Sequence, residues 1–246
     1  LIAISGEFPA NQLNRLPGGY FYKSNIIKTL KQKQLIRTYY RDKLRGYRLT
    51  SYSKSFLLSK NPKRFELALE GSGDTNHIKT EFSRRLRLHR IAEATVTMVN
   101  AGISVFRDEK PDIFSSTYNV NMKKFRPAFY NSREIKEMGL KFVKIKGARA
   151  VGVLLTNQDV FITYNLGGSL MKWEYKAEMR MKALIKSILC SENQHLHYSS
   201  ENVKGLILAN NMELAYDLLI NNCGKQYFLL DGNYEHFYFI TNDRRG

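Results

Sequence analysis

The sequence predicts an α+β protein of two parts: a winged helix-turn-helix at residues 1–70 and an α/β domain with a mixed sheet at residues 79–246. Over residues 6–60, a short polar helix, a Pro-Gly turn and a basic helix precede two short strands around a charged loop. After residue 79, apolar strand patterns alternate with helical ones, which is typical of a sheet flanked by helices. Small polar residues at 71–78 predict a linker.

The helices of the first part follow from periodicity and turn residues. We expect residues 10–16 to form one or two helical turns that end at Pro17-Gly18-Gly19, because proline and paired glycine break a helix. From Tyr22 onward, apolar side chains recur at helical spacing while most of the lysines fall off that stripe. This pattern predicts an amphipathic basic helix with the character of a DNA-recognition helix.

Two short segments after this helix predict a hairpin. Residues 36–41 and 46–50 are rich in β-branched and aromatic side chains, which favour strands. Residues 42–45 lie between them and predict a basic hairpin tip, the wing, which commonly contacts phosphate or the minor groove.

The charge of the chain predicts a polyanionic partner. The 39 Lys and Arg residues exceed the 22 Asp and Glu residues, for a formal net charge of +17. Residues 1–75 hold 14 Lys or Arg against 5 Asp or Glu, a net charge of +9, so over half of the excess lies in less than a third of the chain. Lysine and arginine bind nucleic acid by displacing condensed counterions from phosphates. We therefore expect double-stranded DNA as the partner, while docking of a protein remains the alternative for a winged helix.

The predicted DNA contacts fall into two groups. Ser24, Asn25 and Lys28 are expected to read base edges. The other expected contacts are basic residues, mainly on phosphates: Lys23, Lys31, Lys33, Arg37, Arg41, Lys43, Arg45, Arg84, Arg85 and Arg87. For the arginines at residues 84–90, a solvated face or pairing with acids of the second domain is an equally weighted alternative.

The second part is expected to open with a helix at residues 79–100 that ends before Gly102. Residues 150–155 and 160–164 predict a hairpin around an Asn-Gln-Asp turn. Further strands and helices are expected along the rest of the chain: strands at 103–106, 203–208, 227–230 and 237–240, and helices at 173–189 and 212–221.

Two stretches together resemble a known family. One is the winged unit ending in Gly46-Tyr47-Arg48-Leu49-Thr50, and the other is LRLHRIAEATV at residues 86–96, followed by Ala101-Gly102 and the later hairpin. Residues 6–190 are similar in order to the replication-relaxation proteins of plasmids and integrative elements of Gram-positive bacteria. The resemblance implies a winged helix followed by a sheet related to the PD-(D/E)xK, restriction-endonuclease-like fold. It also implies a role in plasmid-type replication, transfer or transcriptional control.

Nuclease-like members of such a fold carry an acid at the start of the first hairpin strand and another at the end of the second. The corresponding residues here are Arg149-Ala150-Val151 and Thr163-Tyr164-Asn165, none of which is a carboxylate. A Mg²⁺-dependent nuclease needs converging carboxylates, so we expect a scaffold without catalysis, cofactor or metal. The alternative is a PD-(D/E)xK-type nuclease with Mg²⁺ or Mn²⁺ that uses a set of four residues: Asp112, Asp159, Glu174 and Lys176.

The compartment and the further partners follow from what the sequence contains. Cys190 and Cys223 form no disulfide framework or metal-binding spacing, and no signal peptide is visible in the opening LIAIS. No apolar run of membrane-spanning length occurs. We expect a bacterial cytoplasmic protein that is associated with the nucleoid or a plasmid. Its expected further partners are a second copy of the chain or replication or transfer proteins. We expect no membrane partner. Because the chain opens within a pattern and stops at DRRG, we expect residues to be missing at both ends.

Overall fold

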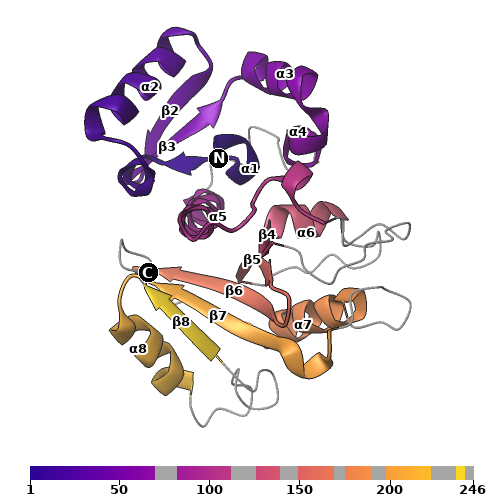
Figure 1. Cartoon of the computed structure of the whole chain (residues 1–246). Helices are drawn as coiled ribbons and strands as arrows, with labels where there is room; N and C mark the ends of the chain where they lie inside the picture. The colour runs from indigo at the N-terminus through magenta and orange to yellow at the C-terminus, as the bar shows by residue number, and fades with distance from the viewer. Residues whose placement is uncertain are drawn as a thin grey trace. The chain divides into compact units, whose positions relative to one another are not determined.

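The computed structural model divides into two compact units (Figure 1). Unit 1 comprises residues 1–102 and 106–109, and unit 2 comprises residues 103–105 and 110–246. The structure describes residues 1–69, 82–111, 126–138, 149–168, 175–189, 198–222 and 237–241. The predicted linker at 71–78 lies outside the described residues.

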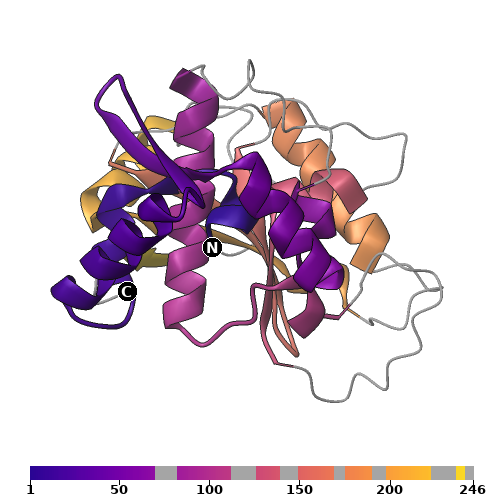
Figure 2. The same ribbon diagram turned by 90° about the horizontal axis from the view of Figure 1, so that it is seen from above.

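Unit 1 combines a small sheet with helices. Its elements in chain order are α1 (Ile2–Ser5), β1 (Phe8–Pro9), a 3₁₀ helix (Ala10–Arg15), α2 (Tyr20–Gln32), β2 (Ile36–Arg41), β3 (Leu44–Leu49), α3 (Ser51–Lys60), α4 (Pro62–Leu69), α5 (Phe82–Asn100) and a 3₁₀ turn (Arg107–Glu109). The three strands are antiparallel in the order β1-β3-β2. Figures 1 and 2 show α2 on one side of this unit and α3 and α4 on the other.

The loop before α2 explains where that helix begins. Gly18 has φ +97°, a conformation that favours glycine, and Gly19 is the extended N-cap residue. Helix α2 therefore begins at Tyr20, two residues before the expected start at Tyr22. The turns predicted over residues 10–16 form a 3₁₀ helix.

The hairpin turn is tighter than predicted. Asp42 and Lys43 both have positive φ, +52° and +62°, as a two-residue type I′ turn requires. Arg41 pairs with Leu44, so β3 begins at Leu44 and the four-residue tip expected at 42–45 shortens to two residues. The type I′ turn matches the right-handed twist of paired strands, which is why pairing continues up to it.

Helix α5 belongs to unit 1, although the sequence suggested that it opens the second domain at residue 79. Its Ala92 and Val96 share a hydrophobic core with Phe8, Ile36 and Tyr47 of the small sheet. A three-stranded sheet needs such a cover, because its apolar face would otherwise stay in water. The boundary between the units therefore follows α5, which ends at Asn100, two residues before Gly102 with its φ of +73°.

Unit 2 is built on one five-stranded mixed sheet in the order β4-β5-β6-β7-β8. Strands β4, β5 and β6 are antiparallel, whereas β6, β7 and β8 are parallel. The elements of this unit are β4 (Ala128–Asn131), α6 (Ser132–Met138), β5 (Ala150–Leu155), β6 (Val160–Gly167), α7 (Tyr175–Leu189), a 3₁₀ turn (Ser200–Asn202), β7 (Val203–Ala209), α8 (Met212–Asn222) and β8 (Phe237–Thr241).

Most of this sheet was predictable. The β5–β6 hairpin, β7, β8, α7 and α8 lie where the sequence predicted them, which confirms a mixed α and β architecture. Strand β4 was not predicted, and the strand expected at 103–106 is reduced to a bridge between Ser104 and Ala128. The strand expected at 227–230 lies outside the described residues.

Side chains of α7 and α8 join those of the sheet in one core, as the connections between parallel strands require. Gly152 of β5 is needed for packing, since a Cβ there would lie 2.4 Å from Cζ of Phe129. In the same unit, the buried Lys110 ammonium donates to Glu134 Oε1 at 2.7 Å and to the carbonyl of Phe129 at 2.9 Å. Within the part of the chain that the structure describes, no helix combines the length and apolarity needed to cross a bilayer.

Candidate nucleic-acid interface

Helix α2 is held to unit 1 by a narrow inner side. Ile27 and Leu30 are partly buried against the core of the unit, and Lys23 lies on the same side. None of the 13 residues of α2 is buried, although all of them are described. Helices that serve only as structure usually bury an apolar stripe. The remaining surface of α2 is therefore open to a partner.

The outer face of α2 carries four exposed side chains in one row. Phe21, Asn25, Lys28 and Gln32 follow one another at spacings of four, three and four residues, which places them on one side of a helix. Asn25 and Lys28 were among the predicted base-reading residues, whereas Phe21 and Gln32 were missed. The same helical spacing in the sequence could have identified both of them.

The predicted cations on α2 and at its C-cap differ in their exposure to solvent. Lys28 and Lys33 are exposed, as is Ser24. Lys31 is exposed with its ammonium 5.4 Å from the ring centroid of Tyr47 on β3, a cation–π contact. Lys23 is partly buried because its ammonium donates to the carbonyls of Leu16 at 3.1 Å and Asn14 at 3.4 Å.

Further cations lie on the β2–β3 hairpin. Arg37, Arg41, Lys43 and Arg45 are all exposed. Arg41 Nε lies 3.5 Å from the carboxylate of Asp42, but both side chains are more than half exposed, so this pair contributes little to stability. The hairpin and the exposed side of α2 thus both present basic side chains to solvent.

Acidic residues are rare in residues 1–65, all of which the structure describes. Glu7 and Asp42 are the only acids in residues 1–65. Glu7 is completely buried, which leaves Asp42 as the one exposed carboxylate of that segment. Within residues 1–65, the exposed cations of α2 and the hairpin therefore outnumber the exposed carboxylates, which favours a positive potential.

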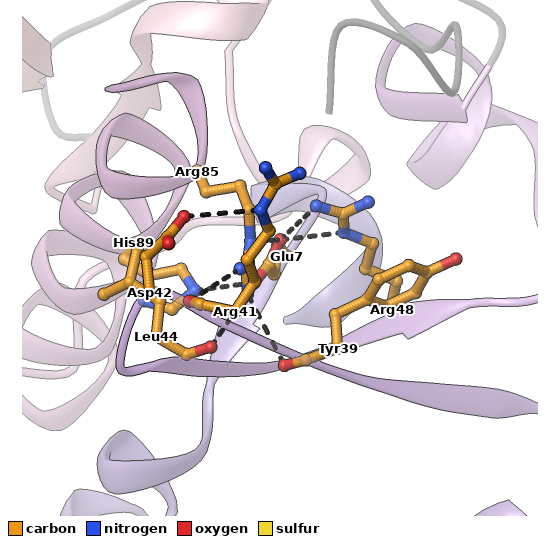
Figure 3. Close-up of polar contacts among 8 residues, drawn as sticks. All are labelled: Glu7, Tyr39, Arg41, Asp42, Leu44, Arg48, Arg85 and His89. Carbon is orange, nitrogen blue, oxygen red and sulfur yellow. Dashed lines mark hydrogen bonds and ion pairs between the residues drawn. The ribbon is translucent and has the colours of Figure 1, made fainter. Parts of the chain in front are cut away.

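Glu7 is the centre of a buried ion cluster (Figure 3). Its carboxylate lies 2.6 Å from Nη2 of Arg48, 2.7 Å from Nη2 of Arg85 and 2.8 Å from Nε2 of His89. All four side chains are buried, at 8% exposure or less. Burial raises the pKa of Glu7, but hydrogen bonds from His89, Arg85 and Arg48 outweigh burial and lower this pKa to about 2.

Arg85 also holds the hairpin in place. Its guanidinium donates to the carbonyl oxygens of Arg41 at 3.1 Å, Leu44 at 3.0 Å and Tyr39 at 3.4 Å, as Figure 3 shows. The prediction that Arg85 contacts DNA is therefore wrong, because the side chain is 2% exposed and its donors bind within unit 1. Helix α5 fixes both strands of the hairpin beside the turn.

The other arginines of this helix have different surroundings. Arg84 is exposed and Arg87 is partly buried. Their contact with DNA stays a prediction. Arg85 does pair with an acid, as one alternative held, but the acid is Glu7 of unit 1 rather than an acid of the second domain.

Glu7 also explains a glycine in β3. A Cβ on Gly46 would lie 2.3 Å from Oε1 of Glu7, well inside contact distance. The sequence offered one clue to Glu7, since it is the only acid in the first 41 residues. Its partners could not be identified from sequence, because 41, 78 and 82 residues separate Glu7 from Arg48, Arg85 and His89.

The alternative nuclease residues of unit 2 do not assemble into a site in the part of the chain that is described. Asp112 and Glu174 lie outside the described residues. Asp159 closes the β5–β6 turn, and its carboxylate lies 2.8 Å from the Lys204 ammonium. Lys176 is exposed on the first turn of α7. No group of three or more His, Cys, Asp or Glu side chains that could hold a metal occurs among the described residues.

The structure also describes the positions at which nuclease-like proteins carry acids, and they lie at the start of β5 and in β6. Ala150 opens β5, and Thr163, Tyr164 and Asn165 are fully buried in β6. The side-chain oxygen of Asn165 accepts a hydrogen bond from the backbone N–H of Gly167 at 2.9 Å, a local structural role.

No protein-family model, curated protein or solved structure matches the chain.

Proposed function

We propose that unit 1 is a winged helix-turn-helix that binds double-stranded DNA in a sequence-specific manner. Helix α2 would enter the major groove, which is wide enough for an α-helix, and the β2–β3 hairpin would act as the wing on the phosphates. The order helix, strand, short helix, α2 and hairpin supports this proposal, together with a sheet in which β3 lies between β1 and β2.

The single observation that carries the proposal is the outer face of α2. It exposes an amide, an amine, a second amide and an aromatic ring in one row, on a helix without any buried residue. Amide side chains pair with adenine in the major groove, and lysine pairs with guanine. A helix face that only contacts solvent does not need a large exposed aromatic ring beside these polar groups, whereas a binding face can use both.

Electrostatics supports the same arrangement. The exposed cations at Arg37, Arg41, Lys43 and Arg45 suit a negatively charged backbone, and contacts of this kind set the register of a protein on DNA. The Arg85 bonds to the hairpin carbonyls would hold the wing in a defined position before DNA binds. Such preorganisation reduces the entropy lost on binding.

Unit 2 is proposed to link DNA binding by unit 1 to replication, transfer or transcriptional control. A mixed sheet centred on a hairpin is compatible with the restriction-endonuclease-like fold that the family resemblance implies. A replication-relaxation protein of a mobile element would use unit 2 to form a homodimer or to bind replication or transfer proteins. This role rests on the resemblance alone.

Fluorescence anisotropy with labelled duplex DNA at low salt tests the proposal on the full chain. Lys28→Ala should weaken binding and relax the sequence preference by about 1–3 kcal/mol at one base pair. Arg45→Ala should weaken binding to all duplexes alike and reduce the slope of log affinity against log salt by about 1. Lys63→Ala on α4 makes the same charge change at an exposed site away from α2, and it should leave binding nearly unchanged.

Equal affinity of Lys28→Ala, Arg45→Ala and the Lys63→Ala control would refute the proposed interface. A parallel incubation with plasmid and Mg²⁺ or Mn²⁺ addresses the nuclease alternative. If the wild-type chain cleaves the plasmid and Glu174→Ala abolishes this cleavage, the protein is a nuclease and the non-enzymatic proposal is wrong.

A further inference from the structure

We propose that Phe21 is a specificity-determining residue that contacts the 5-methyl group of a thymine, within about two base-pair steps of an adenine read by Asn25. This inference rests on the proposed function of α2 and adds the chemical feature that the helix recognises. It assigns Phe21 a role that charge and amide chemistry alone would not suggest.

The exposure of Phe21 is the first observation. Its side chain is 82% exposed, the highest value among the exposed large hydrophobic residues of the described chain. Leaving a phenylalanine ring in water forfeits the favourable free energy of burying it. It also lies in the one row on α2 that holds Asn25 and Lys28, so its apolar surface belongs to the face that would meet the partner.

The two neighbouring aromatics have different surroundings, which separates Phe21 from them. The ring of Tyr22 lies against the turn before α2, since a Cβ on Gly18 would be 3.0 Å from Cδ1 of Tyr22. Tyr20 meets Phe21 edge to face, with ring centroids 5.7 Å apart and planes inclined by 77°. Tyr20 lies next to the N-cap of the helix and one residue away from the row that contains Phe21.

The chemistry of the major groove selects the ligand. The thymine 5-methyl group is the apolar group among the base edges of that groove, and phenylalanine is one of the side chains that contact it. Asparagine binds the N6 and N7 atoms of adenine with two hydrogen bonds. Four residues of α-helix rise about 6 Å, and successive base pairs are about 3.4 Å apart. Phe21 and Asn25 therefore reach bases that are about two steps apart.

Stacking on unpaired bases is a competing use of an exposed ring. Single-strand binders present aromatic side chains on which successive bases stack. The edge-to-face arrangement of Tyr20 and Phe21 offers two rings inclined by 77° rather than a parallel platform. This geometry favours an apolar contact with a duplex edge over stacking.

The experiment replaces single methyl groups on DNA. A duplex selected by the wild-type chain from a random pool is resynthesised with uracil in place of each thymine in turn, which removes only the 5-methyl group. One substitution should weaken binding about fourfold, the equivalent of one buried methyl group at about 0.8 kcal/mol. Phe21→Ala should bind the thymine and uracil duplexes equally, whereas Phe21→Leu should keep part of the preference for thymine.

Tyr20→Ala is the matched control, because it removes an exposed ring from the adjacent position and should retain the full preference for thymine. Circular dichroism should show wild-type helix content in each variant, since both rings are largely exposed. If the wild-type chain binds the duplex but no uracil substitution weakens binding, the role of Phe21 is refuted while DNA binding stands. Loss of affinity in Phe21→Leu as large as in Phe21→Ala also refutes it. Failure to bind any duplex at low salt overturns both proposals.

Discussion

Replacing Glu7 by glutamine should destabilise unit 1 more than any other loss of a single charge in residues 1–65. The substitution keeps the size of the side chain but removes the negative charge that the buried Arg48 and Arg85 guanidinium groups contact. Removing one partner of a buried ion pair costs about 3–5 kcal/mol, because the remaining charge is uncompensated.

The pKa of Glu7 leads to a similar magnitude. A pKa lowered from 4.5 to about 2 corresponds to about 3 kcal/mol of stabilisation of the charged form. Because 1 kcal/mol shifts the melting temperature of a domain of this size by about 4–8 °C, unit 1 of Glu7→Gln should melt roughly 12–24 °C lower.

Differential scanning calorimetry of the full chain at pH 7 measures this shift. Glu66→Gln is the matched control, because Glu66 is exposed on α4 and its replacement should change stability by no more than about 0.5 kcal/mol. Melting of Glu7→Gln within the range of Glu66→Gln would refute the idea that the buried cluster stabilises unit 1.

The same cluster predicts a pH dependence. Because folding lowers the pKa of Glu7, its contribution is fully present above about pH 4.5 and is lost as the pH falls toward about 2. The stability difference between the wild type and Glu7→Gln should therefore shrink as the pH falls from about 4.5 to 2. Chemical denaturation at a series of pH values checks this, and a constant difference down to pH 2 would contradict the assigned pKa.

Three further substitutions test the local geometry of unit 1. Lys43→Gly should raise stability by about 1 kcal/mol, since glycine adopts φ +62° without strain, and should lower DNA affinity because a hairpin cation is lost; urea denaturation and anisotropy measure the two opposite effects. Gly46→Ala should lower stability by about 1–3 kcal/mol because its Cβ would collide with Glu7, and thermal melting checks this. Thr50→Ala should cost about 1 kcal/mol, because the Thr50 hydroxyl accepts the backbone N–H of Ser53 at 3.2 Å and so caps α3; a stability unchanged in urea would contradict this role.

Much of the local structure could be predicted from the sequence. The strand segments predicted at 150–155 and 160–164 are continuous runs of apolar, aromatic and β-branched residues, and all but one of these residues are buried. Such runs identify a buried strand without any knowledge of its neighbours. The end of α5 before Gly102 was equally readable, because a glycine with positive φ is a common helix stop.

The assignment of α5 to a unit was not readable. The periodicity of its apolar residues showed that one side of α5 would be buried. The same periodicity would allow that side to pack against an apolar surface of either unit. The contact of Ala92 and Val96 with Phe8, Ile36 and Tyr47 decided the matter. Element patterns record how a helix is built and do not record which surface it covers.

Some features of the candidate interface were likewise set by the sequence alone, and others only by the tertiary structure. The sequence by itself determined the excess of cations, the basic helix after the Pro-Gly turn and the presence of a hairpin, because these depend on residue type and short spacing. Tertiary structure decided that Arg84 faces solvent while Arg85 is buried, since one residue of helix rotates the side chain by about 100°. It also decided that Glu7 gathers two arginines and a histidine over long separations in the chain. Buried charge is stable only when such partners surround it, and only the fold brings them together.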